Sequence, residues 1–217
     1  WTIDTGRTVA ADRTFINQGS LRVLGTLQSA LTVASGATLA GNGSITGNLT
    51  SAGFVDAGSG TLSVTGDVQL QSGSVLATTV AANGAAGKLA ITGALGFANG
   101  ASVKPTAASG YRITDGAQYT LATATSITGT PTLVGNGLIT WQSTVQNNAF
   151  TVTAQVGARN LVGLSGNAAT ALDAAVAAGG TLAERLLSLP NEAAVRRAAE
   201  QLKPDAGGGT VVGALSA

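Results

Sequence analysis

Apolar and polar residues alternate along most of the chain in short groups. From residue 16 to about residue 103, apolar residues recur two positions apart, as in Leu62 with Val64. Because successive side chains of a strand point to opposite faces, this spacing predicts strands that bury one face. Groups rich in glycine, asparagine and serine separate them, at 58–60 and 99–100 for example. These residue types turn the backbone, so we predict strands of about four to six residues joined by turns.

Many short strands fit two architectures, an antiparallel sandwich and a parallel β-helix. The strings LTVASGATLAG (31–41), LSVTGDVQLQSG (62–73) and LAITGALGFANG (89–100) share a strand, turn, strand layout without hairpin dipeptides. Aromatic residues make up only 4% of the chain, too few for an ordinary sandwich core. We therefore predict an all-β fold, a right-handed parallel β-helix (solenoid) over residues 1–110, with the sandwich as the alternative.

The open end of a solenoid exposes unpaired N–H and C=O groups, so it needs a cap. Aromatic residues gather after residue 110. The segment 146–156 has the pattern of a turn followed by alternating apolar and polar residues. We predict a β-rich C-terminal cap over 111–160. Its core residues are expected to be Tyr111, Tyr119, Leu121, Trp141 and Phe150, with the rings packing inside rather than stacking on a sugar.

The apolar period becomes helical after Gly166. Ala168, Leu172, Ala175 and Val176 form one stripe, and Gly179-Gly180 is expected to end that helix. Thr181 to Glu184 matches a capping box that opens a second helix, and a third is expected from about Asn191 to Leu202. A short α-helical segment is thus predicted within 161–217.

Composition narrows the possible chemistry. Only 10% of residues are charged and the formal net charge is +1, which disfavours nucleic acid as a partner. The chain has no cysteine and no histidine, which excludes Ser-His-Asp and Cys-His catalysis and zinc–thiolate sites. We expect no cofactor, no metal site and no enzymatic activity. No apolar run is long enough to cross a membrane, and the first residues lack signal-peptide features, so we expect an internal segment of a longer protein.

Acidic residues provide the one catalytic alternative. Polysaccharide-active β-helices use clustered carboxylates, so Asp56 and Asp67 would matter if they were neighbours across a rung. The simpler interpretation is that both are solvated turn residues, since aspartate bonds its own backbone in turns.

The order of these segments resembles the autotransporters of Gram-negative bacteria, the type V secretion proteins in which a β-helical passenger precedes an outer-membrane β-barrel. The similarity covers roughly residues 30–217. GTLSVTGDVQLQSGSVLATTV and KLAITGALGFANGASVKP resemble glycine-bounded rungs of the passenger. YRITDGAQYTLATATSITGT resembles the autochaperone region, and GNAATALDAAV through AAVRRAAEQLKPD resembles the helical linker that leads to the barrel.

The resemblance implies a non-catalytic stem that templates passenger folding and supports export to the cell surface or the medium. It also implies that residues 161–217 lead towards an outer-membrane barrel, the chain's expected partner, which would need about twelve further membrane strands. An adhesin surface that binds a host surface or matrix protein is the alternative function, and a polysaccharide-active enzyme is a third.

Overall fold

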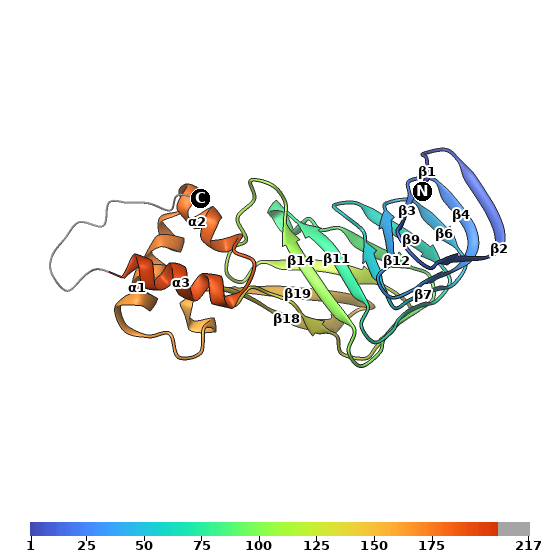
Figure 1. Ribbon diagram of the computed structural model, residues 1–217. Helices are drawn as coiled ribbons and strands as arrows, with labels where there is room; N and C mark the ends of the chain where they lie inside the picture. Colours follow the sequence, from blue (N-terminus) through green and yellow to red (C-terminus); the bar gives the residue numbers. More distant parts are fainter. Residues whose placement is uncertain (204–217) are drawn as a thin grey trace. The chain divides into compact units, whose positions relative to one another are not determined.

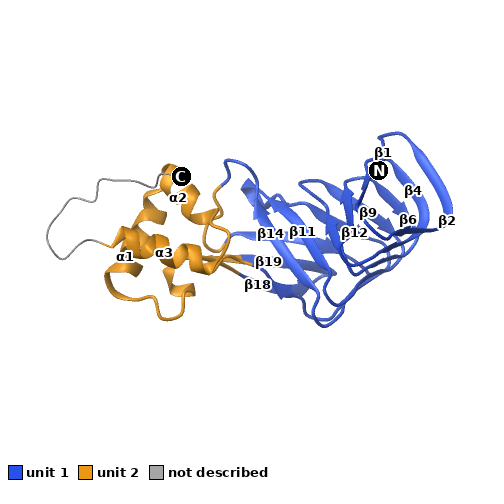
Figure 2. Cartoon of the chain, viewed as in Figure 1, with its two compact units in different colours: residues 1–111, 117–134, 141–153 blue, residues 112–116, 135–140, 154–217 orange. Residues whose placement is uncertain are grey.

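The computed structural model describes residues 1–203, so the end of the predicted linker, 204–217, lies outside the described residues. The described chain is mostly β-sheet and ends in a short helical segment (Figure 1). It divides into two compact units (Figure 2). Unit 1 comprises residues 1–111, 117–134 and 141–153, and the described part of unit 2 comprises residues 112–116, 135–140 and 154–203.

One sheet has seven strands, all paired in parallel. In spatial order they are β1 (Thr2–Ile3), β3 (Ser20–Val23), β5 (Thr38–Gly41), β8 (Phe54–Asp56), β11 (Val75–Val80), β14 (Ser102–Ala107) and β17 (Thr132–Leu133). The register pairs Ser20 with Thr38, Thr38 with Phe54, Phe54 with Val75, Val75 with Ser102 and Ser102 with Thr132. We call the chain between such partners a repeat; successive repeats are 18, 16, 21, 27 and 30 residues long.

The second sheet has twelve strands arranged in two arms that meet on β4. Residues 26–28 of β4 pair with β6, and residues 31–33 pair with β7. The strands are β2 (Thr8–Ile16), β4 (Thr26–Val33), β6 (Ser44–Thr46), β7 (Leu49–Ser51), β9 (Thr61–Thr65), β10 (Val68–Leu70), β12 (Lys88–Ile91), β13 (Ala94–Phe97), β15 (Gln118–Thr123), β16 (Ser126–Thr128), β18 (Ile139–Gln146) and β19 (Ala149–Val156). Each repeat from β5 onward therefore adds one strand to the seven-stranded sheet and one to each arm.

Columns of buried apolar residues explain why these strands stack in register. One column runs through the seven-stranded sheet and comprises Leu21, Leu39, Val55, Leu76 and Val103. Another runs through one arm and comprises Leu31, Leu49, Val68 and Leu95. A shift by one residue would turn a whole strand's apolar side chains to the outside. Burial of apolar area, worth about 25 cal/mol per Å², therefore favours this register over a shifted one. The buried columns also confirm the predicted spacing of apolar residues two positions apart.

The strand pairs exclude the hairpin sandwich that the sequence left open. Every strand pair described among β1–β17 is parallel. An antiparallel sandwich requires neighbouring strands to be joined by hairpins, whereas parallel partners need a long connection. The repeats of 16–30 residues provide that connection.

A Thr-Gly corner connects the two arms in three successive repeats. The motif occurs as ITGNLTS (45–51), VTGDVQL (64–70) and ITGALGF (91–97). A Cβ atom on Gly66 would lie 2.7 Å from the backbone oxygen of Gly47, so only glycine lets the repeats approach this closely. The side chains after the glycines bond from one repeat to the next. Asn48 Oδ1 accepts the Asp67 N–H at 2.9 Å, and Asp67 Oδ1 accepts the Ala94 N–H at 2.8 Å.

Unit 2 contains the three helices α1 (Gly166–Ala178), α2 (Gly180–Leu187) and α3 (Glu192–Leu202). Its core comprises Leu138, Ala158, Leu161, Leu172, Leu186, Val195, Ala198 and Ala199. Leu172, Ala175 and Val176 of the predicted α1 stripe pack here. α3 begins as expected, because Asn191 Oδ1 accepts the Ala194 N–H at 3.0 Å. The predicted capping box is wrong: α2 begins at Gly180, and its N-cap Gly179 has no side chain to cap it.

Polar side chains from loops of unit 2 bond to the end of α2 and to β19. The Asn136 amide donates to the backbone oxygens of Leu187 and Leu189 at 3.0 and 2.9 Å, where α2 ends. The Asp115 carboxylate accepts the Val156 N–H, and this hydrogen bond, with that of Arg159, lowers the pKa of Asp115. Among the described residues, no helix has the length and apolar content needed to cross a membrane.

Candidate functional site

In the predicted cap, the pairing between named strands changes from parallel to antiparallel. β19 runs antiparallel to β15, with Tyr119 opposite Val152 and Thr120 opposite Thr151. β18 lies next to β19 at the end of the twelve-stranded sheet. Asn147 and Asn148 join β18 to β19 with φ angles of 49° and 63°, as a tight hairpin requires. The predicted turn and alternation at 146–156 are therefore confirmed.

A bulge places Leu121 in the core of the cap. Thr120 pairs with Thr151 and Ala122 pairs with Phe150, so Leu121 is an extra residue in β15 with no partner in β19. Leu121 and Ala122 are consequently both buried, although consecutive residues of a regular strand point to opposite faces. On its other edge, Ala122 pairs in parallel with Leu89 of β12. The bulge thus lies in the strand that has a parallel neighbour, β12, on one edge and an antiparallel neighbour, β19, on the other.

Tyr119 is buried, and its hydroxyl is satisfied within the cap. The hydroxyl oxygens of Tyr111 and Tyr119 lie 2.8 Å apart and share a hydrogen bond. Burial, followed by the contact with the Tyr111 hydroxyl, raises the pKa of Tyr119 above the ordinary value of a phenol. The ring packs edge-on against Trp141, with 6.0 Å between ring centroids and 71° between planes.

A second aromatic pair attaches the cap to the strand stack. Phe150 of β19 lies 5.2 Å, centroid to centroid, from Phe97 at the end of β13. Sequence reasoning missed Phe97, although it occupies the position of Ser51 and Leu70 in the preceding Thr-Gly repeats. Aligning these repeats at their glycines would have shown that only the last one carries a ring there.

The structure brings the predicted core residues of the cap together in unit 1. Tyr119, Leu121, Trp141 and Phe150 are buried, and Tyr111 is half-buried. The hydroxyls of Tyr111 and Tyr119 bond each other, and Tyr119 and Phe150 lie in the β15–β19 strand pair. Chemically, this arrangement offers a packed aromatic surface and an ordered strand edge on which further main chain can pair.

The two acids of the catalytic alternative lie apart in the fold. Asp56 ends β8 of the seven-stranded sheet, and its Oδ1 accepts the Gly58 N–H at 2.8 Å. Asp67 lies in the corner between β9 and β10 of the other sheet and accepts the Ala94 N–H. Asp56 therefore makes a bond within its own turn, Asp67 makes one to the next repeat, and the structure does not bring the two carboxylates together. No group of three metal-ligating acids occurs among residues 1–203.

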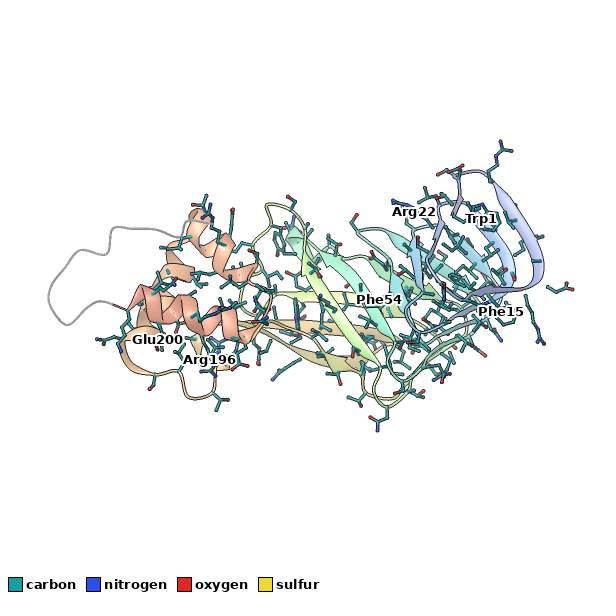
Figure 3. The ribbon with its side chains drawn as sticks, in the orientation of Figure 1. Trp1, Phe15, Arg22, Phe54, Arg196 and Glu200 are labelled. Atoms are coloured by element: carbon teal, nitrogen blue, oxygen red, sulfur yellow. The ribbon has the colours of Figure 1, made fainter. Side chains whose placement is uncertain are left out.

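The outer surface of unit 1 carries two shallow depressions. A notch of about 200 Å³ is lined by Arg22, Ala40, Asn42, Asp56 and Ser59. A groove of about 320 Å³ lies over β7, β10, β13 and β16 and is lined by polar residues such as Asn48, Asp67 and Gln69 and by apolar ones such as Leu49 and Val68. Large apolar side chains also lie on this surface, among them Phe15 with 59% and Phe54 with 46% of its area exposed (Figure 3).

Comparison of the chain with protein-family models and with curated proteins finds no match.

Proposed function

We propose that this chain is the C-terminal part of an autotransporter passenger, in which a right-handed parallel β-helix forms a non-catalytic stem. In this proposal the antiparallel cap is the autochaperone region, and the helices of unit 2 lead towards the protein's own outer-membrane barrel. The stem would be displayed on the surface of a Gram-negative bacterium or released from it.

The observation that carries the proposal is the register of the parallel repeats. Because Leu21, Leu39, Val55, Leu76 and Val103 share one buried column, each repeat covers the apolar side chains of the one before it. Such a stack contacts only nearest neighbours, so it grows by addition of repeats to an ordered end. A segment that folds first can then template the rest.

The cap supports the same function because its β15–β19 pair and its Tyr119–Trp141 contact join residues within 111–156. Its hairpin pairs across the edge of β15, and its rings are buried against each other and against Phe97. We infer that this segment folds early and offers a formed edge to the repeats that precede it in the chain. Pairing of each repeat outside the cell would then bias the chain to move outward.

The kinetic test compares one cap residue with one residue of the stack. Phe150→Ala and Leu39→Ala each remove a fully buried side chain, and each is expected to cost about 3–5 kcal/mol of folding free energy. If the cap is the template, Phe150→Ala slows refolding, whereas Leu39→Ala mainly accelerates unfolding. Stopped-flow tryptophan fluorescence of the whole chain measures both rates. A larger refolding defect for Leu39→Ala than for Phe150→Ala would contradict a templating cap.

The proposed location is tested separately from folding. Antibodies against unit 1 should label intact cells of the producing organism, and protease added outside those cells should remove the signal. Labelling that requires permeabilised cells would refute surface display, whatever the outcome of the kinetic test.

An adhesin surface is a second candidate because exposed rings lie on unit 1. Trp1, Phe15 and Phe54 have between 46% and 77% of their area exposed. Exposed aromatic residues are common at protein-binding surfaces. Pull-down with purified matrix proteins, and its loss on Phe15→Ser substitution, would support this function; equal capture by the substituted chain would count against it.

A further inference from the structure

The outer face of the seven-stranded sheet carries a row of residues in which charges alternate in sign. Register pairs place Arg22, Ala40, Asp56, Ala77 and Lys104 side by side on successive strands. Their chain neighbours Leu21, Leu39 and Val55 are buried, so this row faces outward. The row therefore reads positive, small, negative, small, positive, and we call it the charged row.

Within one molecule, the charged residues of this row form no ion pairs with one another. Arg22 and Asp56 are separated by the intervening strand β5, a backbone distance of about 9.5 Å. Neither belongs to an ion pair among the described residues, and Asp56 accepts only the turn N–H of Gly58. Ala40 lies between them, and its small side chain leaves room for the notch of about 200 Å³ that Arg22 and Asp56 also line. The face thus presents two unpaired opposite charges on either side of a depression.

A neighbouring outward row adds an exposed ring. It comprises Ser20, Thr38, Phe54 and Val75, in register on β3, β5, β8 and β11, which are four of the five strands of the charged row. Phe54 has 46% of its area exposed, beside two small side chains in this row. Aromatic residues and arginine are enriched at protein–protein interfaces relative to the rest of the surface, and Phe54 and Arg22 lie on this face.

We propose that this face pairs with the same face of a second copy of the chain, about a two-fold axis that runs along β5. Such an axis reverses the order of strands but keeps the position along each strand. It sets β3 against β8 of the second copy and leaves β5 facing itself. Arg22 then meets Asp56 of the second copy, and Asp56 meets Arg22. An isologous dimer of this kind makes every contact twice.

The second row fits the same axis. Phe54 meets Ser20 of the second copy, and the small Thr38 and Ala40 face their own equivalents, so no two bulky side chains collide. Like charges are also avoided, because Lys104 of β14 lies beyond the five strands that overlap. The overlap spans only β1, β3, β5, β8 and β11, so the interface belongs to the small class, below about 1,200 Å² in total, and the dimer is weak.

This pairing depends on the parallel register alone and not on the proposed secretion role. Either inference can therefore fail while the other stands.

Charge reversal tests the pairing with the full chain. Sedimentation equilibrium at concentrations up to about 1 mM should detect a dimer of the unsubstituted chain that weakens as salt is raised. Arg22→Asp gives a face with two negative charges and Asp56→Arg one with two positive charges. Each should self-associate at least about tenfold more weakly, since both contacts become repulsive. The double variant should associate like the unsubstituted chain.

Mixing the two single variants gives the sharpest outcome. Every contact between an Arg22→Asp chain and an Asp56→Arg chain joins opposite charges, so the mixture should form a heterodimer. Lys104→Asp changes a charge of the same row outside the overlap and should leave association unchanged. If Asp56→Arg does not fold, the order unsubstituted, Arg22→Ala, Arg22→Asp in decreasing affinity tests the same contact.

Three results would overturn the proposal. One is an unsubstituted chain that stays monomeric at the highest concentration. Another is self-association of the single variants equal to that of the unsubstituted chain. The third is a loss of association with Lys104→Asp as large as that with Arg22→Asp.

Discussion

At the scale of single residues, the stack tolerates very few polar atoms inside it. The hydroxyl oxygens of Ser74 and Thr78 are buried without a hydrogen-bond partner among the described residues. By contrast, Ser51 is equally buried, but its hydroxyl donates to the Gly53 oxygen and accepts the Gly53 N–H. A buried hydroxyl without a partner costs about 1–3 kcal/mol. Thr78 is thus a place where the sequence is not optimal for stability.

Thr78→Val is therefore expected to stabilise the chain by about 1 kcal/mol, because valine has the same shape and no polar atom to desolvate. Urea unfolding followed by circular dichroism measures the change. Thr78→Ser is the matched control: it keeps the hydroxyl, removes a buried methyl group and should destabilise. A loss of stability in the valine variant would show that the hydroxyl has a hydrogen-bond partner, such as a buried water.

Ionisation of Tyr119 is expected to lower the free energy of unfolding at high pH. Its pKa in the folded chain is raised above the unfolded value of about 10, so the folded state holds the proton more tightly. The resulting stability is present below about pH 10 and is lost as pH rises above it. Tyr119→Phe cannot titrate, so it should flatten the decline in unfolding free energy between about pH 9 and 11. Equal slopes for the two chains in that range would contradict this assignment.

At the scale of elements, the Thr-Gly corners decide how closely the repeats stack. A Cβ on Gly66 would lie within 2.7 Å of the Gly47 oxygen and of Asn48 Oδ1, whereas one on Gly73 would meet nothing within 4 Å. Both glycines have positive φ angles, of 154° and 79°. Gly73→Ala therefore measures the cost of a positive φ angle without a clash, whereas Gly66→Ala adds the clash at a φ angle closer to extended backbone.

Gly73→Ala should cost about 1 kcal/mol, which is the conformational penalty alone. Gly66→Ala should cost about 3 kcal/mol or more, because the two repeats must also move apart. Chemical denaturation of both variants gives the difference. If the two substitutions cost the same, the corner is not held by close approach.

Much of this element structure could be predicted from the sequence, for reasons visible at particular residues. Leu62 with Val64 and Leu89 with Ile91 are buried as their spacing indicates, because period two depends only on local geometry. The bulge at Leu121 could not be predicted, since it arises where β15 pairs with β12 on one edge and β19 on the other. The start of α2 was misplaced because Gly179 and Gly180 both have positive φ angles and form a break without a side-chain cap.

The candidate site shows the same division. The aromatic residues of the cap were predicted because rings gather after residue 110; Tyr119, Trp141 and Phe150 are buried, and Tyr111 is half-buried. Phe97 was missed because its contact with Phe150 joins segments more than fifty residues apart. The separation of Asp56 from Asp67 could likewise not be predicted. It depends on the assignment of β8 to one sheet and of β9 and β10 to the other, which the local sequence does not indicate.

At the scale of the whole molecule, the two units have separate cores. The buried cluster around Leu172 consists of residues of unit 2 alone. The columns through Leu39 belong to unit 1. Stability is therefore expected to be local, with different regions opening at different free energies.

Leu172→Ala tests this separation. The substitution should lower the free energy of opening in unit 2 by about 3–5 kcal/mol through the cavity it leaves. Hydrogen exchange read by mass spectrometry should show faster exchange in 161–203 and unchanged protection in 20–107. Leu39→Ala should give the reverse. Loss of protection across the whole chain in both variants would mean that the two units unfold as one.

The matched positions of Ala37 and Gly53, each just before a strand of the same sheet, carry an evolutionary consequence. Excising 38–53 would join Ala37 to Phe54 and bring Val64 beside Leu27 and Val68 beside Leu31, which repeats the existing apolar columns. Genes for such a chain can lengthen or shorten by whole repeats through duplication or loss. An insertion of any other length must instead form a loop at a corner between strands.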